Sequence, residues 1–151
     1  MGLMDGDAGP PPSKAPRYII TGVAVLLAVT IPLYLLLRFH TEKATAHQFL
    51  DELVAGDYQG AYRTWKPGSS YSFQDFMRDW GPSGEYGPVK SYDLESARSP
   101  GGASGVIITV GVSSVAPYPS DSASNIKEIR LWVERSDQSI SYAPQEIHIV
   151  R

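Results

Sequence analysis

The sequence predicts an α+β protein with one membrane-spanning helix near its N-terminus, followed by a domain of helices and then a curved antiparallel sheet. Three observations support this fold class. The stretch from Tyr18 to Leu37 contains no charged side chain. After Arg38, apolar residues recur every three or four positions, as in amphipathic helices, and from Lys90 onward they alternate at every second position, as in strands. Helices and strands in separate runs are typical of α+β folds.

The uncharged stretch has the length and composition of a transmembrane helix. Twenty helical residues span about 30 Å, the thickness of the hydrocarbon layer of a bilayer. Twelve of the twenty are Ile, Leu or Val, which favour insertion. We therefore expect a transmembrane helix over residues 17–39. The preceding residues 1–16 are rich in Gly and Pro and have little to bury, so they are expected to form a disordered tail.

A cleavable signal peptide is the alternative interpretation, because Ala44-Thr45-Ala46 has the small-x-small form of a cleavage site. The apolar run is longer than the 7–15 residues of a signal sequence, which favours an uncleaved anchor. Lys14 and Arg17 before the span balance Arg38 and Lys43 after it, so the basic residues do not set the orientation. A short tail and a long following domain predict a single-pass protein of the plasma membrane, with a cytoplasmic N-terminus and the domain outside.

Three helices are expected at the start of the domain, residues 41–151. The first has an apolar stripe and ends at Gly56, which suits a left-handed residue. Asp57 caps the second, and Ser72-Phe73-Gln74-Asp75 is a capping box for the third. The apolar residues of these helices, in order, are Ala46, Phe49, Leu50, Leu53, Val54, Tyr58, Ala61, Tyr62, Trp65, Phe73, Phe76, Met77 and Trp80.

Strands are expected over Lys90–Ser96 and Gly105–Val115, followed by a strand around Ile129, Leu131 and Val133 and a closing strand at Ile147 and Ile149. A long loop is expected over Ala116–Asn125. Strand lengths near ten residues and hairpin-type connections predict a bent antiparallel sheet.

Composition excludes several functions. Residues 41–151 contain ten Lys or Arg against fourteen Asp or Glu, and a nucleic-acid-binding domain needs a basic face instead. The chain has no cysteine, which excludes disulfides, thiol nucleophiles and cysteine-based zinc sites. The three histidines do not have the spacing of a metal motif, and no nucleophile elbow is present. The sequence therefore predicts no cofactor, no metal and no nucleic-acid partner.

The run from Ala46 to Tyr62 resembles the opening helices of the nuclear transport factor 2-like superfamily: an amphipathic helix, then Gly56-Asp57-Tyr58, then Ala61-Tyr62. The Phe73-x-x-Phe76 helix and the step from Gly87-Pro88 into a strand are similar as well. The resemblance covers about residues 44–150 and implies a curved sheet wrapped around helices, a cone-shaped roll with a pocket. Some relatives are isomerases or dehydratases, and many only bind or scaffold, so the resemblance implies no particular activity.

Aromatic side chains at helical spacing are either core or pocket lining. The candidate pocket residues are Tyr58, Tyr62, Trp65, Phe76, Trp80 and Tyr92. Trp132 falls on the face of its strand opposite Ile129, Leu131 and Val133, where it is either exposed or part of a contact such as a homodimer formed through the sheet.

The leading hypothesis is a membrane-anchored binding or scaffold module for a protein partner or small ligand, either alone or as an accessory subunit of a membrane complex. Ala24 and Ala28 form a small-x-x-x-small face for helix packing in the latter case. The alternative is a pocket enzyme of the isomerase or dehydratase type. Such an enzyme would place an aspartate among Asp75, Asp79 and Asp93 beside a tyrosine among Tyr58, Tyr62, Tyr86 and Tyr92.

Overall fold

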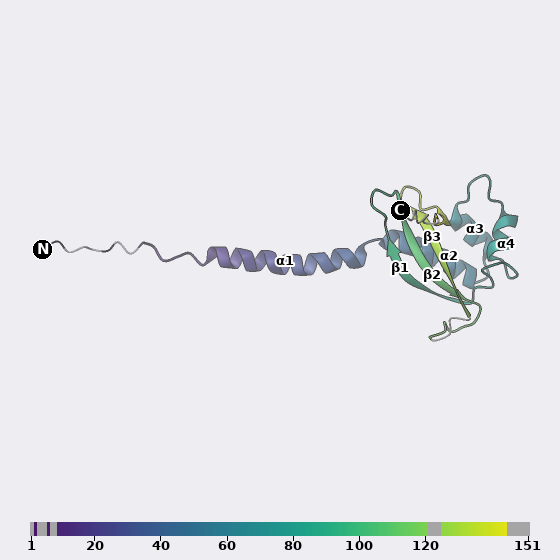
Figure 1. Cartoon of the computed structure of the whole chain (residues 1–151), viewed down its shortest axis with the longest axis horizontal. Coiled ribbons are helices and arrows are strands. Elements are labelled where there is room, and N and C mark those ends of the chain that lie inside the picture. The colour runs from purple at the N-terminus through teal and green to yellow at the C-terminus, as the bar shows by residue number, and fades with distance from the viewer. Residues whose placement is uncertain (1, 3–5, 7–8, 121–124, 145–151) are drawn as a thin grey trace, which may run out of the picture. The chain divides into compact units, whose positions relative to one another are not determined.

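The computed structural model describes residues 2, 6, 9–120 and 125–144. Its contacts divide the chain into two compact units, residues 1–38 and residues 39–151, which we describe separately. The first unit contains helix α1, Ala15–Leu37 (Figure 1). The helix has a proline in its first turn. None of the side chains of α1 is buried within the protein. The helix is long and apolar enough to cross a membrane.

The second unit begins with three helices, α2 (His40–Val54), α3 (Tyr58–Trp65) and α4 (Phe73–Trp80). The predicted helix end and the two predicted helix caps are confirmed. Gly56 has a φ of +77°, Asp57 accepts a hydrogen bond from the Gly60 backbone amide at 2.9 Å, and Ser72 and Asp75 form a capping box at the start of α4. Local hydrogen bonds thus start α3 and α4 at the residues that the sequence indicates.

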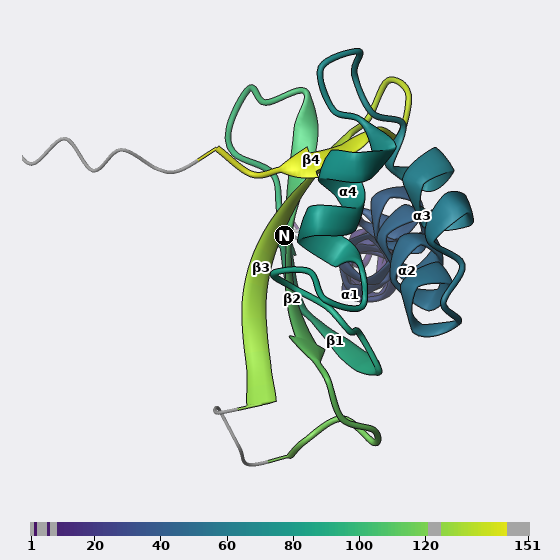
Figure 2. The same ribbon diagram turned by 90° about the vertical axis from the view of Figure 1, so that its right-hand side faces the viewer.

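Four antiparallel strands form one open sheet in the order β1 (Ser91–Arg98), β2 (Gly105–Ser113), β3 (Ile126–Glu134) and β4 (Ile140–Tyr142). In β1, a bulge shifts the register between Leu94 and Ser96. Helices α2, α3 and α4 lie against one face of the sheet (Figure 2). This order of helices and strands confirms the α+β class and the antiparallel sheet.

The core lies between this face and the helices. It contains the predicted stripe of α2, the large aromatic residues of α3 and α4, and the alternate residues of β2 and β3. The fully buried large side chains are Trp80, Phe49, Phe76, Leu50, Ile108, Leu131, Val106, Val110, Val112 and Val133. The strand prediction is confirmed for β3, where Ile129, Leu131 and Val133 are buried and their neighbours are partly or fully exposed.

The prediction for Val54 is wrong: its side chain is 40% exposed. Val54 is the last residue of α2, and the stripe leaves the core one residue earlier, at Leu53.

The outer face of β2 is buried as well. Ile107 is buried, and the Tyr118 hydroxyl lies 2.1 Å from the position that a Cβ of residue 111 would occupy. Glycine lets the Tyr118 hydroxyl lie against the strand, and a side chain at position 111 would require that hydroxyl to move.

The ends of the strands differ from the predictions. Strand β1 runs from Ser91 to Arg98, β2 ends at Ser113 instead of Val115, and the short β4 was not predicted. The expected closing strand at Ile147 and Ile149 lies outside the described residues, as do residues 1, 3–5, 7 and 8 of the expected disordered tail.

Candidate functional site

Tyr86 lies on the loop that connects α4 to β1. The loop folds back on the last turn of α4, where the Tyr86 amide donates to the Asp79 carbonyl at 2.8 Å. A Cβ on residue 87 would lie 1.9 Å from the Gly81 carbonyl oxygen, so Gly87 permits this close approach. The Tyr86 ring packs on Trp80, with a centroid distance of 5.0 Å. The buried end of α4 therefore holds Tyr86 in place.

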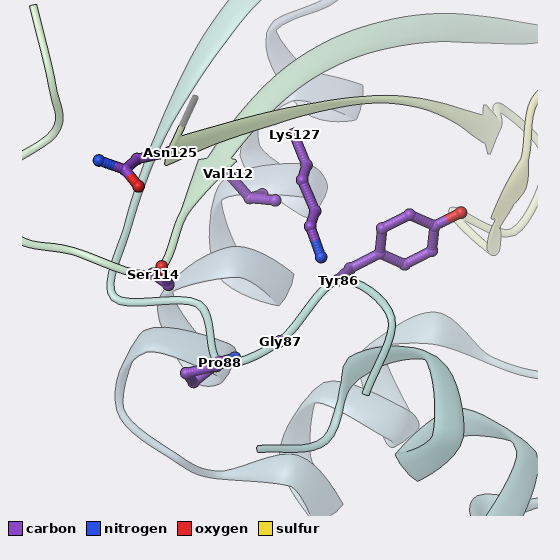
Figure 3. A pocket seen from close by; sticks show the side chains of 7 residues that line it. All are labelled: Tyr86, Gly87, Pro88, Val112, Ser114, Asn125 and Lys127. Carbon is purple, nitrogen blue, oxygen red and sulfur yellow. The ribbon is translucent and has the colours of Figure 1, made fainter. Parts of the chain in front are cut away.

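Two clefts share Tyr86 in their walls. One, of about 220 Å³, lies between the loop and the ends of β2 and β3 (Figure 3). The other, of about 290 Å³, lies along β3 and β4. Besides Tyr86, the first is lined by Gly87, Pro88, Val112, Ser114, Asn125 and Lys127, and the second by Glu128, Ile129, Arg130, Tyr142, Ala143 and Pro144.

The first cleft has a polar, positively charged wall. The Lys127 side chain extends toward the loop, and its ammonium group donates to the Glu85 carbonyl (Figure 3). Val112 forms an apolar part of the wall, and Ser114 and Asn125 add a hydroxyl and an amide. Among the described lining residues, Lys127 is the one with a charged side chain. The chemistry suits a small polar or anionic group.

Asp79 is at the centre of a hydrogen-bond network beside the second cleft. Its Oδ2 accepts from the Tyr71 hydroxyl at 2.5 Å and from the Tyr142 hydroxyl at 2.9 Å. Burial, followed by the hydrogen bond to Asp79, raises the pKa of Tyr71. Burial is also the largest cause that raises the pKa of Tyr142. Both phenols therefore stay protonated as donors, and together they tie β4 and the loop before α4 to α4 itself.

A second tyrosine–carboxylate pair lies where α2 meets β1. The Tyr92 hydroxyl donates to Asp51 Oδ1 at 2.5 Å and lies 3.0 Å from His47 Nδ1. Burial and this bond to Asp51 raise the pKa of Tyr92. His47 and Asp51 also line a shallow depression on the exposed side of α2. Here the carboxylate is exposed at the surface, whereas Asp79 is half-buried.

The other predicted pocket residues pack against one another. Trp65, Phe76 and Trp80 are buried, and Tyr58 and Tyr62 pack at the edge of the same core. The ring centroids of Trp65 and Trp80 lie 6.0 Å apart, and those of Tyr62 and Phe76 lie 5.5 Å apart. These five side chains belong to the core between the helices and the sheet, and Tyr92 also packs against this core while its hydroxyl is bonded to Asp51.

Trp132 lies on the outer face of the sheet and is half-buried. Its ring covers Gly105, where a Cβ would lie 2.5 Å from the indole, and its Nε1 donates to Glu134 at 3.3 Å. Contacts within the sheet thus account for part of its burial.

In each tyrosine–carboxylate network, only one side of the contact was predicted from the sequence. Asp79 was among the predicted site residues, but Tyr71 and Tyr142 were not, and Tyr92 was predicted without Asp51. The members of each pair are separated by 8, 63 and 41 residues. Tyr142 lies on the unpredicted strand β4, so no local pattern indicates its proximity to Asp79. Within the described part of the chain, no three His, Asp or Glu side chains are grouped as metal ligands would be.

Comparison of this chain with protein-family models, with characterised proteins and with solved structures finds no match. The likeness to the nuclear transport factor 2-like superfamily therefore stays a prediction.

Proposed function

We propose that this chain is a single-pass membrane protein whose α+β domain is a binding or scaffold module, with the two clefts beside Tyr86 as its binding site. The observation that carries the proposal is helix α1. It has 23 residues and buries none of them in the protein, although residues 18–37 are uncharged. So large an apolar surface needs a lipid or protein environment.

The start of α2 supports an uncleaved anchor. Ala46, the last residue of the candidate cleavage site, is fully buried and lies inside α2. Cleavage there would remove the first two turns of a helix that packs against the sheet. We propose that the protein lies in the plasma membrane with its N-terminus in the cytoplasm, its domain outside, and the sheet of that domain forming the cone-shaped roll of the superfamily that it resembles.

The aromatic core supports binding at the surface rather than within an interior pocket. Phe49 and Trp80 are completely buried, and their ring centroids lie 5.1 Å apart. Neither ring faces solvent or a cleft. The clefts beside Tyr86 combine polar groups, a lysine and apolar walls, and such a lining suits a small polar ligand or a side chain of a partner.

Anchoring and topology are tested by fractionation and proteolysis of the full-length protein. We expect it to stay with membranes washed in carbonate, and a protease added to intact cells to digest the domain. A protein that washes off unclipped would contradict the proposal. Binding is tested with the same protein in lipid nanodiscs as bait: a partner captured by the wild type is expected to be lost with Lys127→Glu and retained with Lys90→Glu, a control outside the lining.

A pocket enzyme is the second candidate, and the Asp79 network is the observation that favours it. A carboxylate with two tyrosine hydroxyls next to a cleft resembles an acid–base site in composition. In a catalytic role, Asp79→Asn would abolish turnover of an isomerase or dehydratase substrate while the fold stays intact. Unchanged turnover by this variant would remove the candidate.

A further inference from the structure

The end of the domain at which α2 begins, which we name the anchor end, is built from four segments: residues 39–45, residues 98–104, residues 134–139 and Lys66. Polar contacts hold them together. Arg135 Nε lies 3.7 Å from Glu42 Oε1, and Arg135 also donates to the Ser99 hydroxyl at 2.9 Å. The Thr45 hydroxyl donates to Gln138 at 2.8 Å, and the Lys66 ammonium donates to the Asp137 carbonyl.

Phe39 joins the same group of contacts. The Arg135 guanidinium lies 5.8 Å from the centre of its ring, and the ring packs against the hydrophobic core. Glu42 is buried and has Arg135 as its cation, so separating them would leave a buried charge unpaired. The four segments therefore behave as one surface.

The chain between the two units is very short. Helix α1 ends at Leu37 and α2 begins at His40. Three Cα–Cα steps of 3.8 Å reach at most about 11 Å. The headgroup layer on each side of a bilayer is roughly 5–8 Å thick, as the difference between total and hydrocarbon thickness indicates. If α1 spans the membrane, as the proposed function states, the first residues of α2, which belong to the anchor end, lie within or next to the headgroups.

Charge separates the anchor end from the remainder of the domain. Among the described residues, the anchor end has four basic side chains (Lys43, Lys66, Arg98 and Arg135) and three acidic ones (Glu42, Glu134 and Asp137). The remainder of the described domain has five basic and nine acidic side chains. The anchor end is thus the part of an acidic domain that a negatively charged surface would repel least.

We propose that the anchor end is a docking surface for anionic phospholipid headgroups, with Lys43 and Lys66 as phosphate contacts. Lys43 lies in the first turn of α2, next to the point at which the chain leaves α1. A basic residue near an anionic membrane strengthens attraction about fivefold. Two lysines would shift the domain substantially toward the bound position, and the inference rests on the proposed membrane anchoring.

The test uses the full-length protein, whose lack of cysteine permits labelling at single introduced sites. Gly101→Cys places a fluorophore on the anchor end, where a Cβ meets no atom within 4 Å. Gln59→Cys, on α3 beyond the far end of α2, is the control position. The labelled proteins are reconstituted into vesicles of phosphatidylcholine, with or without phosphatidylglycerol, and quenching is measured with acrylamide, which is uncharged.

We expect phosphatidylglycerol to reduce quenching at residue 101 several-fold and to leave quenching at residue 59 unchanged. The variant Lys43→Glu/Lys66→Glu should abolish the reduction, as should high salt. Arg78→Glu/Lys90→Glu, with the same change in charge, should preserve it. If the double variant unfolds, Lys43→Glu alone takes its place, because the described residues make no contact with the Lys43 ammonium group. This single variant should at least halve the reduction in quenching at residue 101.

Equal quenching at residue 101 in the two kinds of vesicle would overturn the inference, as would an equal response to both double variants. Protection by inorganic phosphate in pure phosphatidylcholine vesicles would overturn it in favour of a free-anion site. Carbonate extraction of the same vesicles separates this inference from the proposed function. A chain that is retained but equally quenched contradicts the inference alone, and a chain that is washed off contradicts both.

Discussion

Helices α1 and α2 are adjacent in the sequence and opposite in their chemistry. None of the side chains of α1 is buried, although nearly every one is apolar. Helix α2 has a mixed composition, yet Phe49, Leu50 and Leu53 on one side of it are buried. A helix with a periodic apolar stripe packs that stripe against the core of its own domain. A helix that is apolar all round needs an apolar environment on every side, such as a bilayer. Variants in α1 should therefore change membrane retention, and variants in the core of the domain should change its unfolding free energy.

The largest expected effect comes from placing charge in α1. Leu26→Arg/Leu27→Arg should make membrane insertion less favourable by about 6–8 kcal/mol, because two arginines are costly in the bilayer and two favourable leucines are lost. Retention in carbonate-washed membranes should be lost, while the unfolding midpoint of the domain stays unchanged, because α1 contributes nothing to its core. The control Leu26→Ala/Leu27→Ala should remain in the membrane. A shift in the domain's midpoint would contradict the independence of the two units.

Trp80→Ala should have the opposite pattern. Removal of this buried ring should destabilise the domain by about 3–5 kcal/mol, measured by urea denaturation, with membrane retention unchanged. Trp80 Nε1 has no hydrogen-bond partner in the described structure. Trp80→Phe, which removes this donor and keeps an aromatic ring, should therefore cost less than Trp80→Ala. Equal losses for the two variants would contradict the packing that we describe.

Asp79→Ala leaves the hydroxyls of Tyr71 and Tyr142 without their acceptor. The domain should lose roughly 1–3 kcal/mol of stability, and β4 should exchange its amide hydrogens faster. Asp51→Ala, which removes the corresponding acceptor of Tyr92 at an exposed site, is the matched control and should cost less. A larger loss of stability for Asp51→Ala than for Asp79→Ala would show that the exposure of the carboxylate does not decide the strength of the two networks.

Alkaline pH tests the same network. Burial raises the pKa of Tyr71 and Tyr142 above the ordinary value of 10.0. The unfolded chain ionises first, so the contribution of these two tyrosines to stability is constant below pH 10.0 and falls as the pH rises above it. Urea midpoints measured across this range should decline, and Tyr71→Phe/Tyr142→Phe should flatten the decline. A decline that begins below neutral pH would have another cause.

The smallest effect is expected at Gly56, where α2 ends. A φ of +77° disfavours any side chain, but a Cβ there would meet no atom within 4 Å. Gly56→Ala should therefore cost only about 1–2 kcal/mol, the strain of a left-handed residue, measured by urea denaturation. Gly68→Ala, at an open site without positive φ, should be close to neutral.

The elements with local signals were predictable from the sequence. The caps at Asp57 and Ser72, the left-handed Gly56 and the alternation in β3 depend on neighbouring residues. Strand β4 has only three residues, and its pairing with Leu131–Val133 depends on the path of the whole chain. For the same reason, the contacts of Asp79 with Tyr71 and Tyr142 and the clefts beside Tyr86 could not be predicted. They arise where segments distant in the sequence meet.

Gly111 and Tyr118 have a consequence for how this protein can change over generations. The phenol oxygen occupies the space that a methyl group at position 111 would need. The two sites should therefore change in concert: a methyl group at position 111 fits when the end of the Tyr118 side chain moves aside or when the tyrosine is replaced by a shorter residue.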